Sequence, residues 1–224
     1  MQEKSLYNMN AAGMESALST NKVLKNTYML LGLTLLFSAV TAGISMAMGL
    51  GQGAALILML VGFGLLFVVN RTADSGKGLL AIFGFTGVMG ASIGPMLNFY
   101  LAMPGGPALV MQALGGTALV FFGLSAYALT TRKDFSFMGG FLMVGLLVVV
   151  VAMIANIFLA IPALSLTISA AVVMIMSGLI LFDTSRIING GETNYIRATV
   201  SLYLNIYNLF IHMLSLLTAL GGDD

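Results

Sequence analysis

The chain has 224 residues, of which 59% are hydrophobic and only 8% are charged, whereas about a quarter of the residues of an ordinary soluble domain are charged. Nine Lys and Arg with eight Asp and Glu cannot give so much apolar sequence a polar exterior, so the composition excludes a soluble enzyme and indicates a protein surrounded mostly by lipid. Because there is no cysteine, disulfides and thiolate metal sites are excluded.

The positions of the charges predict seven membrane spans. Charged residues are absent from four stretches, of 45, 54, 48 and 25 residues, at 26–70, 78–131, 135–182 and 198–222. Since a spanning helix takes about 20 apolar residues, the first three stretches each hold two helices and the last holds one. Breakers rich in Gly or Pro, at 49–53, 103–107 and 159–163, divide the three long stretches. The predicted spans are 27–48, 54–70, 78–101, 107–131, 135–158, 164–186 and 198–219.

The basic residues predict the orientation of this all-α, seven-helix membrane protein. With seven spans, all nine Lys and Arg fall at one end of the helices, and basic residues near helix ends are retained on the cytoplasmic side. We therefore expect a cytoplasmic N-terminal tail at 1–26, one membrane domain at 27–219 and a short tail outside the membrane at 220–224. The 1–26 segment lacks the features of a secretory signal, and nothing in the charge pattern indicates nucleic-acid binding.

A polar stripe in the last span is the clearest candidate site. Its members are spaced by 4, 3, 4 and 3 residues, which places them on one helical face; they are Ser201, Asn205, Asn208, His212 and Ser215. The stripe could supply interhelical hydrogen bonds that hold the bundle together, or it could line a cavity or an ion path. His212, alone and without cysteines nearby, is a poor metal ligand.

Asp183 is the only acidic residue that the predicted spans place within a helix. One interpretation is a helix-end carboxylate that is solvated or is paired with Arg186, three residues further on. The other is a buried carboxyl whose ionisation gates the bundle, because carboxylates within membranes are commonly functional. Arg71, Arg186 and Arg197 are its candidate counter-ions.

Glycines at 84, 87, 90 and 94 form a second pattern, in the third span. Gly90 and Gly94 make a small-xxx-small pair, which allows two helix backbones to approach closely. We expect Gly84, Gly87, Gly90 and Gly94 to serve helix packing, with a groove facing a substrate as the alternative.

Membrane enzyme chemistries do not fit these residues. A retinal protein needs a lysine within a span, and every lysine here is at a helix end or in the tail. An aspartic protease needs two carboxyls sharing a site, and Asp183 has no acidic companion in the spans. The nearest match to a serine protease motif, at 123–126, lacks the second glycine. We therefore expect no enzymatic activity, no cofactor and no metal site.

Three segments resemble one known family. The runs at 118–122, 128–140 and 181–203 are similar to the Bax inhibitor-1 family, and the likeness extends over nearly the whole chain from about Lys22. The resemblance implies seven helices, a cytoplasmic N-terminus and a seventh helix surrounded by the other six. For a bacterial member it implies a multi-pass protein of the inner membrane, with its C-terminus in the periplasm.

The family also implies two functions. Some members are described as pH-sensitive calcium-leak channels governed by two aspartates, one on each of the last two helices. Asp183 matches the first, but the second position is Asn205 here, and an Asp–Asn pair cannot share a proton as two carboxyls can. Bacterial inner-membrane members are instead associated with the membrane-anchored, ATP-dependent protease of the FtsH type.

The resemblance therefore leads to two hypotheses for this chain. The first is a regulatory membrane protein that binds and modulates an FtsH-type protease and is degraded by it, with the 1–26 tail as the segment that the protease grips. The alternative is a leak for Ca²⁺ or H⁺ that uses Asp183 and the polar face of the seventh helix.

Overall fold

The computed structural model describes the backbone of residues 2–221 and the side chains from residue 18 to 221. Its described part is all-helical. The helices are α1 (Gln2–Ala47), α2 (Gln52–Thr72), α3 (Lys77–Leu101), α4 (Gly106–Thr131), α5 (Met138–Leu159), α6 (Pro162–Ile188) and α7 (Tyr195–Gly221).

Each helix contains a segment long and apolar enough to cross a membrane, as the charge pattern predicts. The bounds of α2 to α7 lie within three residues of the predicted spans. The predicted breakers lie at the connections between helices. The left-handed backbone of the first two falls on glycine, at Gly49 (φ 62°) and Gly105 (φ 69°), and that of the third falls on Ala160 (φ 49°). The lengths of the charge-free stretches and the positions of Gly and Pro therefore predict the bounds of α2 to α7 closely.

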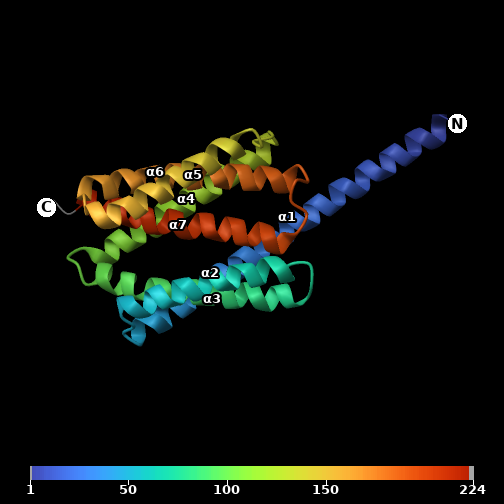
Figure 1. The fold of residues 1–224 in the computed structure, drawn as a ribbon. Coiled ribbons are helices and arrows are strands. Elements are labelled where there is room, and N and C mark those ends of the chain that lie inside the picture. The colour runs from blue at the N-terminus through green and yellow to red at the C-terminus, as the bar shows by residue number, and fades with distance from the viewer. Residues whose placement is uncertain (1, 222–224) are drawn as a thin grey trace.

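The largest difference from the predicted bounds is at α1. The helix begins at Gln2 rather than near residue 27, so the predicted tail continues the first helix, and its N-terminal part extends away from the bundle (Figure 1). Residues 2–26 contain no proline and many strong helix formers such as Ala, Leu, Met, Glu and Lys. Those residues let the helix continue beyond the stretch from residue 18 that is apolar enough to cross a membrane.

The bundle has two groups of helices with α7 between them (Figure 1). In one group α3 packs against α1 and α2, and in the other α6 packs against α4 and α5. Helix α7 packs against α1, α2 and α3 on one side and against α4 and α6 on the other. Its side chains are therefore shared between both halves, and many of them are buried.

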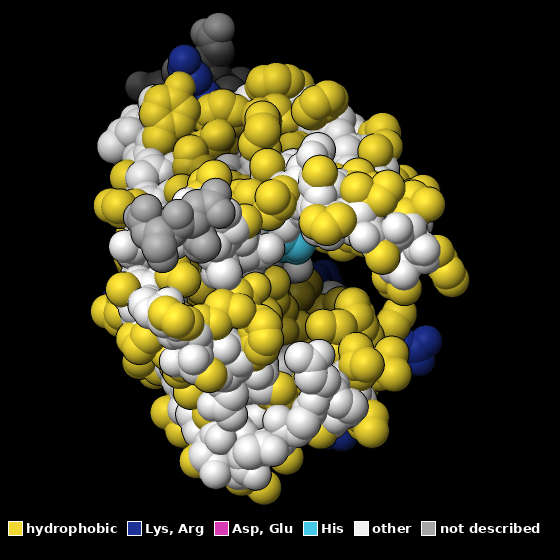
Figure 2. Space-filling view, turned by 90° about the vertical axis from the view of Figure 1, so that its left-hand side faces the viewer, with side chains coloured by type: hydrophobic (Ala, Val, Ile, Leu, Met, Phe, Trp, Pro, Cys, Tyr) yellow, Lys and Arg dark blue, Asp and Glu magenta, His cyan; other side chains and the backbone are white. Residues whose placement is uncertain are grey.

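Large hydrophobic side chains cover the outside of the bundle. Phe67 of α2 and Phe158 of α5 are among the many apolar side chains that are exposed, and in the end-on space-filling view hydrophobic side chains lie around the rim of the molecule (Figure 2). Continuous apolar surface of this kind is unusual on a soluble monomer. It is the surface expected of helices that face lipid.

Asn194 begins α7 and ties it to the turn between α2 and α3. Its side-chain oxygen accepts hydrogen bonds from the backbone N–H groups of Ile196 (2.9 Å) and Arg197 (3.2 Å), as an N-cap residue does. Its amide nitrogen donates to the Ala73 carbonyl at 3.0 Å and to Asp74 at 2.8 Å. One side chain thus caps a helix and joins two loops.

We expect Asn194→Ala to lower the free energy of unfolding by about 1–2 kcal/mol, the usual cost of losing an N-cap side chain. Arg197→Ala is the control, because Arg197 forms an exposed ion pair with Asp74 and such pairs contribute about 0–1 kcal/mol. Thermal unfolding in detergent, followed by circular dichroism, compares the two variants. Equal unfolding temperatures would contradict the capping role.

Candidate functional site

Asp183 of α6 and Asn205 of α7 meet in the interior of the bundle. The Asn205 side-chain amide donates a hydrogen bond to Asp183 Oδ2 at 2.8 Å. Asn205 is buried and Asp183 is half-buried. The two positions that the family resemblance singles out are therefore in direct contact, through a single hydrogen bond between an amide and a carboxyl group.

The candidate counter-ions make their closest contacts with other groups. Among the described side chains, none of the three arginines forms an ion pair with Asp183. Arg186 lies 3.9 Å from Glu192, donates to the Gly191 carbonyl at 3.2 Å and stacks over the Phe182 ring.

The other two arginines, like Arg186, are not ion-paired with Asp183. Arg197 pairs with Asp74, and Arg71 is exposed at the end of α2. Among the described side chains, therefore, no ion pair joins Asp183 to Arg186. Spacing of three residues allowed that contact, but the loop after α6 brings Glu192 to Arg186 instead.

The remaining members of the polar stripe form hydrogen bonds mostly to α6 or within α7 itself. His212 Nδ1 lies 3.1 Å from Ser169 Oγ of α6, and Ser215 Oγ lies 3.5 Å from the same atom. The Asn208 amide donates to the Leu204 carbonyl of its own helix at 2.8 Å, and Ser201 is half-buried. Figure 2 shows the His212 ring at the edge of a hollow at one end of the molecule. The hydrogen bonds that join Asn205, His212 and Ser215 to side chains of α6 are the contacts that the bundle-holding interpretation of the stripe expects.

Two tyrosines of α7, which sequence reasoning missed, connect it to the other half of the bundle. The Tyr203 hydroxyl lies 2.7 Å from Ser38 Oγ of α1 and donates to the Thr86 carbonyl of α3 at 3.3 Å. The Tyr207 hydroxyl lies 3.0 Å from Ser92 Oγ of α3. The available signal was their spacing of four residues in an apolar helix, because a buried tyrosine hydroxyl requires a hydrogen-bond partner.

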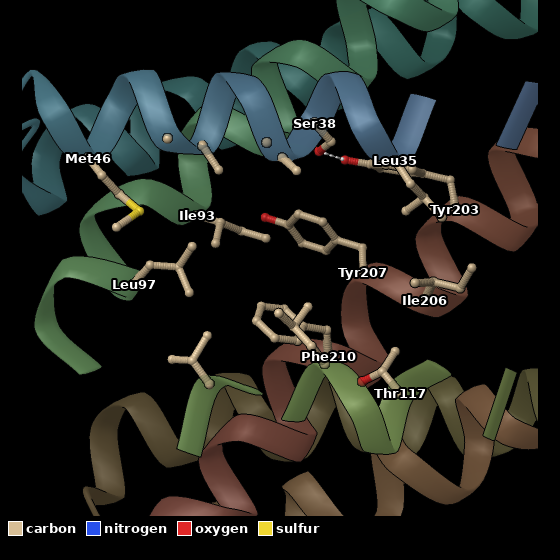
Figure 3. A pocket seen from close by; sticks show the side chains of 16 residues that line it. Leu35, Ser38, Met46, Ile93, Leu97, Thr117, Tyr203, Ile206, Tyr207 and Phe210 are labelled. Atoms are coloured by element: carbon tan, nitrogen blue, oxygen red, sulfur yellow. Dashed lines mark hydrogen bonds between the residues drawn. The ribbon is translucent and has the colours of Figure 1, made fainter. Parts of the chain in front are cut away.

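A cavity of about 280 Å³ lies between α1, α3, α4 and α7 (Figure 3). Apolar side chains such as Leu35, Ile93 and Phe210 form most of its wall, and the hydroxyl-bearing residues of the wall are Ser38, Thr117, Tyr203 and Tyr207. No member of the polar stripe lines it. This cavity is therefore on a different face of α7 from Asp183 and Asn205.

Three of the four glycines of α3 that we expected to serve helix packing lie against α1. A Cβ atom added at Gly90 would overlap the Ser38 carbonyl oxygen, one at Gly94 would overlap Ser45 Oγ, and one at Gly87 would lie 2.6 Å from the Phe37 ring. Gly84 is exposed, and a Cβ there would meet nothing within 4 Å. Gly84 therefore does not share in the α1–α3 contact, because it points to the outside of the helix pair.

Comparison with known proteins identifies the family of the chain. Residues 20–222 match the family described as "Inhibitor of apoptosis-promoting Bax1". The chain is 58% identical to "Modulator of FtsH protease YccA" of Escherichia coli (strain K12), over 93% of this chain and 94% of that protein. It is 52% identical to an "Uncharacterized membrane protein" of Vibrio cholerae, over 95% of this chain and 96% of that protein.

A third relative is "Uncharacterized protein PA2604" of Pseudomonas aeruginosa, 46% identical over the whole length of both chains. The same similarity of 58% is found with a protein of another Escherichia coli strain, named "Inner membrane protein YccA". With seven helices able to cross a membrane in the part of the chain that the structure describes, the chain is a multi-pass inner-membrane protein, and it belongs to the Bax inhibitor-1 family.

Proposed function

We propose that this chain binds and modulates a membrane-anchored, ATP-dependent protease of the FtsH type, and that the protease also degrades it. The observation that carries the proposal is the 58% identity, over 93% of the chain, to a protein named as a modulator of FtsH protease.

The proposal includes the orientation and the place of α7. The N-terminus is cytoplasmic, because all nine basic residues lie at that end of the helices, and the C-terminus is periplasmic. Helix α7 is the central helix, and five of the other six pack against it. Its packing against both groups of helices supports this arrangement.

The N-terminal part of α1 is the proposed contact with the protease. It extends away from the bundle (Figure 1), on the side where the positive-inside rule places the cytoplasm. Chain ends that protrude from a packed domain are the usual points at which proteolysis begins. An enzyme that unfolds its substrates from one end could therefore engage α1 before it reaches the bundle.

Deleting residues 2–20 is expected to lengthen the half-life of the chain in cells and to remove its effect on protease activity. The half-life is measured by blocking synthesis and following the remaining protein in membranes that contain the protease. Removal of residues 222–224, at the opposite end of the chain, is the control and should leave turnover unchanged. If the 2–20 deletion is turned over as fast as the full chain, the N-terminal contact is wrong.

The leak hypothesis is the second proposal, and it needs a conducting path along the polar face of α7. The hydrogen bonds that join Asn205 and His212 to α6 favour a bundle-holding role for that face instead. A Ca²⁺ flux measurement in liposomes that compares the parent chain with Asp183→Asn tests this alternative.

A further inference from the structure

The cavity between α1, α3, α4 and α7 opens toward the lipid. Its lining includes exposed residues on two helices, Ala39 and Gly43 of α1 and Leu114 of α4. Helices α1 and α4 do not pack against each other, so the opening lies between them. Beside it, Val40 and Met111 expose apolar side chains, which places the opening within the hydrophobic surface that faces the membrane.

The cavity lies toward one end of the bundle along the helix axes, the end at which α1 finishes and α4 begins. Its α1 residues fall near the C-terminal end of that helix, and its α4 residues fall near the start of α4. Both places adjoin the turns at 48–51 and 102–105. A compound dissolved in the bilayer leaflet on the side of these two turns can therefore reach the cavity sideways, without passing through water.

One polar group in the wall has no protein partner. Thr117 is 4% exposed and lines the cavity (Figure 3), and among the described residues its Oγ1 atom has no hydrogen-bond partner. A threonine within a helix usually bonds the carbonyl four residues earlier, as Thr86, in the wall-forming helix α3, does at 2.9 Å. An unsatisfied buried hydroxyl is costly, so Thr117 is suited to bond something that enters the cavity.

The other hydroxyls of the wall are already engaged. Ser38 and Tyr203 bond each other, and Tyr207 bonds Ser92. The wall therefore offers one free hydroxyl, which can donate and accept, in an otherwise apolar surface. Such a combination, apolar walls with a single placed polar group, is typical of small-molecule sites.

We propose that this cavity binds a membrane-dissolved amphiphile with a hydrocarbon body and one hydroxyl or carbonyl oxygen, which enters between α1 and α4 and forms a hydrogen bond with Thr117. The hydrocarbon body of the ligand packs against the wall formed by Leu35, Ile93 and Phe210. The ligand oxygen satisfies the Thr117 hydroxyl. Binding at this place would bridge α1 and α4, which have no direct contact, and so would stabilise the bundle.

The test uses the purified full chain in lipid nanodiscs and two photoactivatable probes. One is hexadecanol with a diazirine near its hydroxyl, and the other is hexadecane with a diazirine at the same carbon. Labelled peptides are identified by mass spectrometry over a range of probe concentrations. We expect the alcohol to label the cavity walls of α1, α4 and α7 at lower concentration than the hydrocarbon does.

Two matched pairs of variants locate the binding. Thr117→Val removes the hydroxyl and keeps the side-chain shape, and it should weaken labelling by the alcohol about fivefold, as loss of one hydrogen bond does, with no change for the hydrocarbon. Ser125→Ala is its control, because Ser125 is also a buried hydroxyl of α4 without a described partner but does not line the cavity.

The second pair tests the opening. Gly43→Leu places a side chain at the cavity and should reduce labelling by both probes, whereas Gly32→Leu, also in α1 and with nothing within 4 Å of an added Cβ, should not. Variants are compared only when they elute as the parent chain does on size exclusion. Equal labelling of the cavity by alcohol and hydrocarbon, or alcohol labelling that survives Thr117→Val or Gly43→Leu unchanged, would overturn the proposal.

Discussion

Gly90→Leu is expected to prevent formation of the folded bundle. A Cβ at Gly90 would overlap the backbone carbonyl oxygen of Ser38 and the hydroxyl of Thr41, and a backbone atom within a helix cannot move aside as a flexible side chain can. Overpacking of a well-packed interior costs about 1–3 kcal/mol and occasionally more. Because the clash at Gly90 is with a backbone atom, we expect a cost at the upper end of this range or above it. The readouts are the yield of monodisperse protein in detergent and its unfolding temperature.

Gly84→Leu is the matched control for Gly90→Leu. It makes the same change in the same helix, six residues away, at a position where an added Cβ meets nothing within 4 Å. Because leucine is a better helix former than glycine, this variant should be as stable as the parent chain or slightly more so. If the two variants unfold at the same temperature, α1 and α3 are not in close contact at Gly90.

Asn205→Leu is expected to lower the free energy of unfolding by about 2 kcal/mol or more, the range for hydrogen bonds to charged groups. The substitution removes the amide that donates to Asp183, and among the described residues no basic side chain pairs with that carboxyl. Asp183→Leu and the double variant complete a double-mutant cycle. The double variant should be more stable than the sum of the single changes predicts, by about 1–3 kcal/mol. Additive effects would show that the two side chains do not interact.

The same pair decides the alternative of an ion leak. If Asp183 and Asn205 hold α6 to α7 and do no more, liposomes with Asp183→Asn should show the same Ca²⁺ permeability as liposomes with the parent chain, at acidic and at neutral pH. Asn is close in shape to Asp, so the variant keeps the site filled. A Ca²⁺ flux that depends on pH in the parent chain and is lost in Asp183→Asn would establish the leak.

The bounds of α2 to α7 could be predicted from the sequence because lipid imposes a simple rule on helices that cross it. Every backbone polar group in hydrocarbon must be bonded within its own helix, so charge-free length and breakers such as Gly49 and Gly105 determine the spans. The start of α1 was not predictable from that rule. Residues 2–17 are outside the apolar stretch, and their helix depends on the propensity of the side chains themselves.

The partners of the polar residues could be predicted only in part. The family resemblance placed Asp183 opposite Asn205, which the structure joins by a hydrogen bond. Periodicity placed the stripe on one face of α7, but it contains no information about which helix lies opposite. For the same reason neither the contact of His212 with Ser169 nor the cavity beside Tyr203 was predicted, since each brings together residues far apart in the chain.

The modulator proposal is tested most directly by reconstituting the purified FtsH-type protease in liposomes with and without the full chain. The rate at which the protease degrades a separate membrane substrate is measured in each case, together with the rate at which this chain itself disappears. The proposal predicts that the full chain changes the degradation rate of the other substrate and is itself degraded when ATP is present, and that the 2–20 deletion weakens both effects. Identical substrate degradation with and without the chain, with the chain itself stable in the presence of ATP, would contradict it.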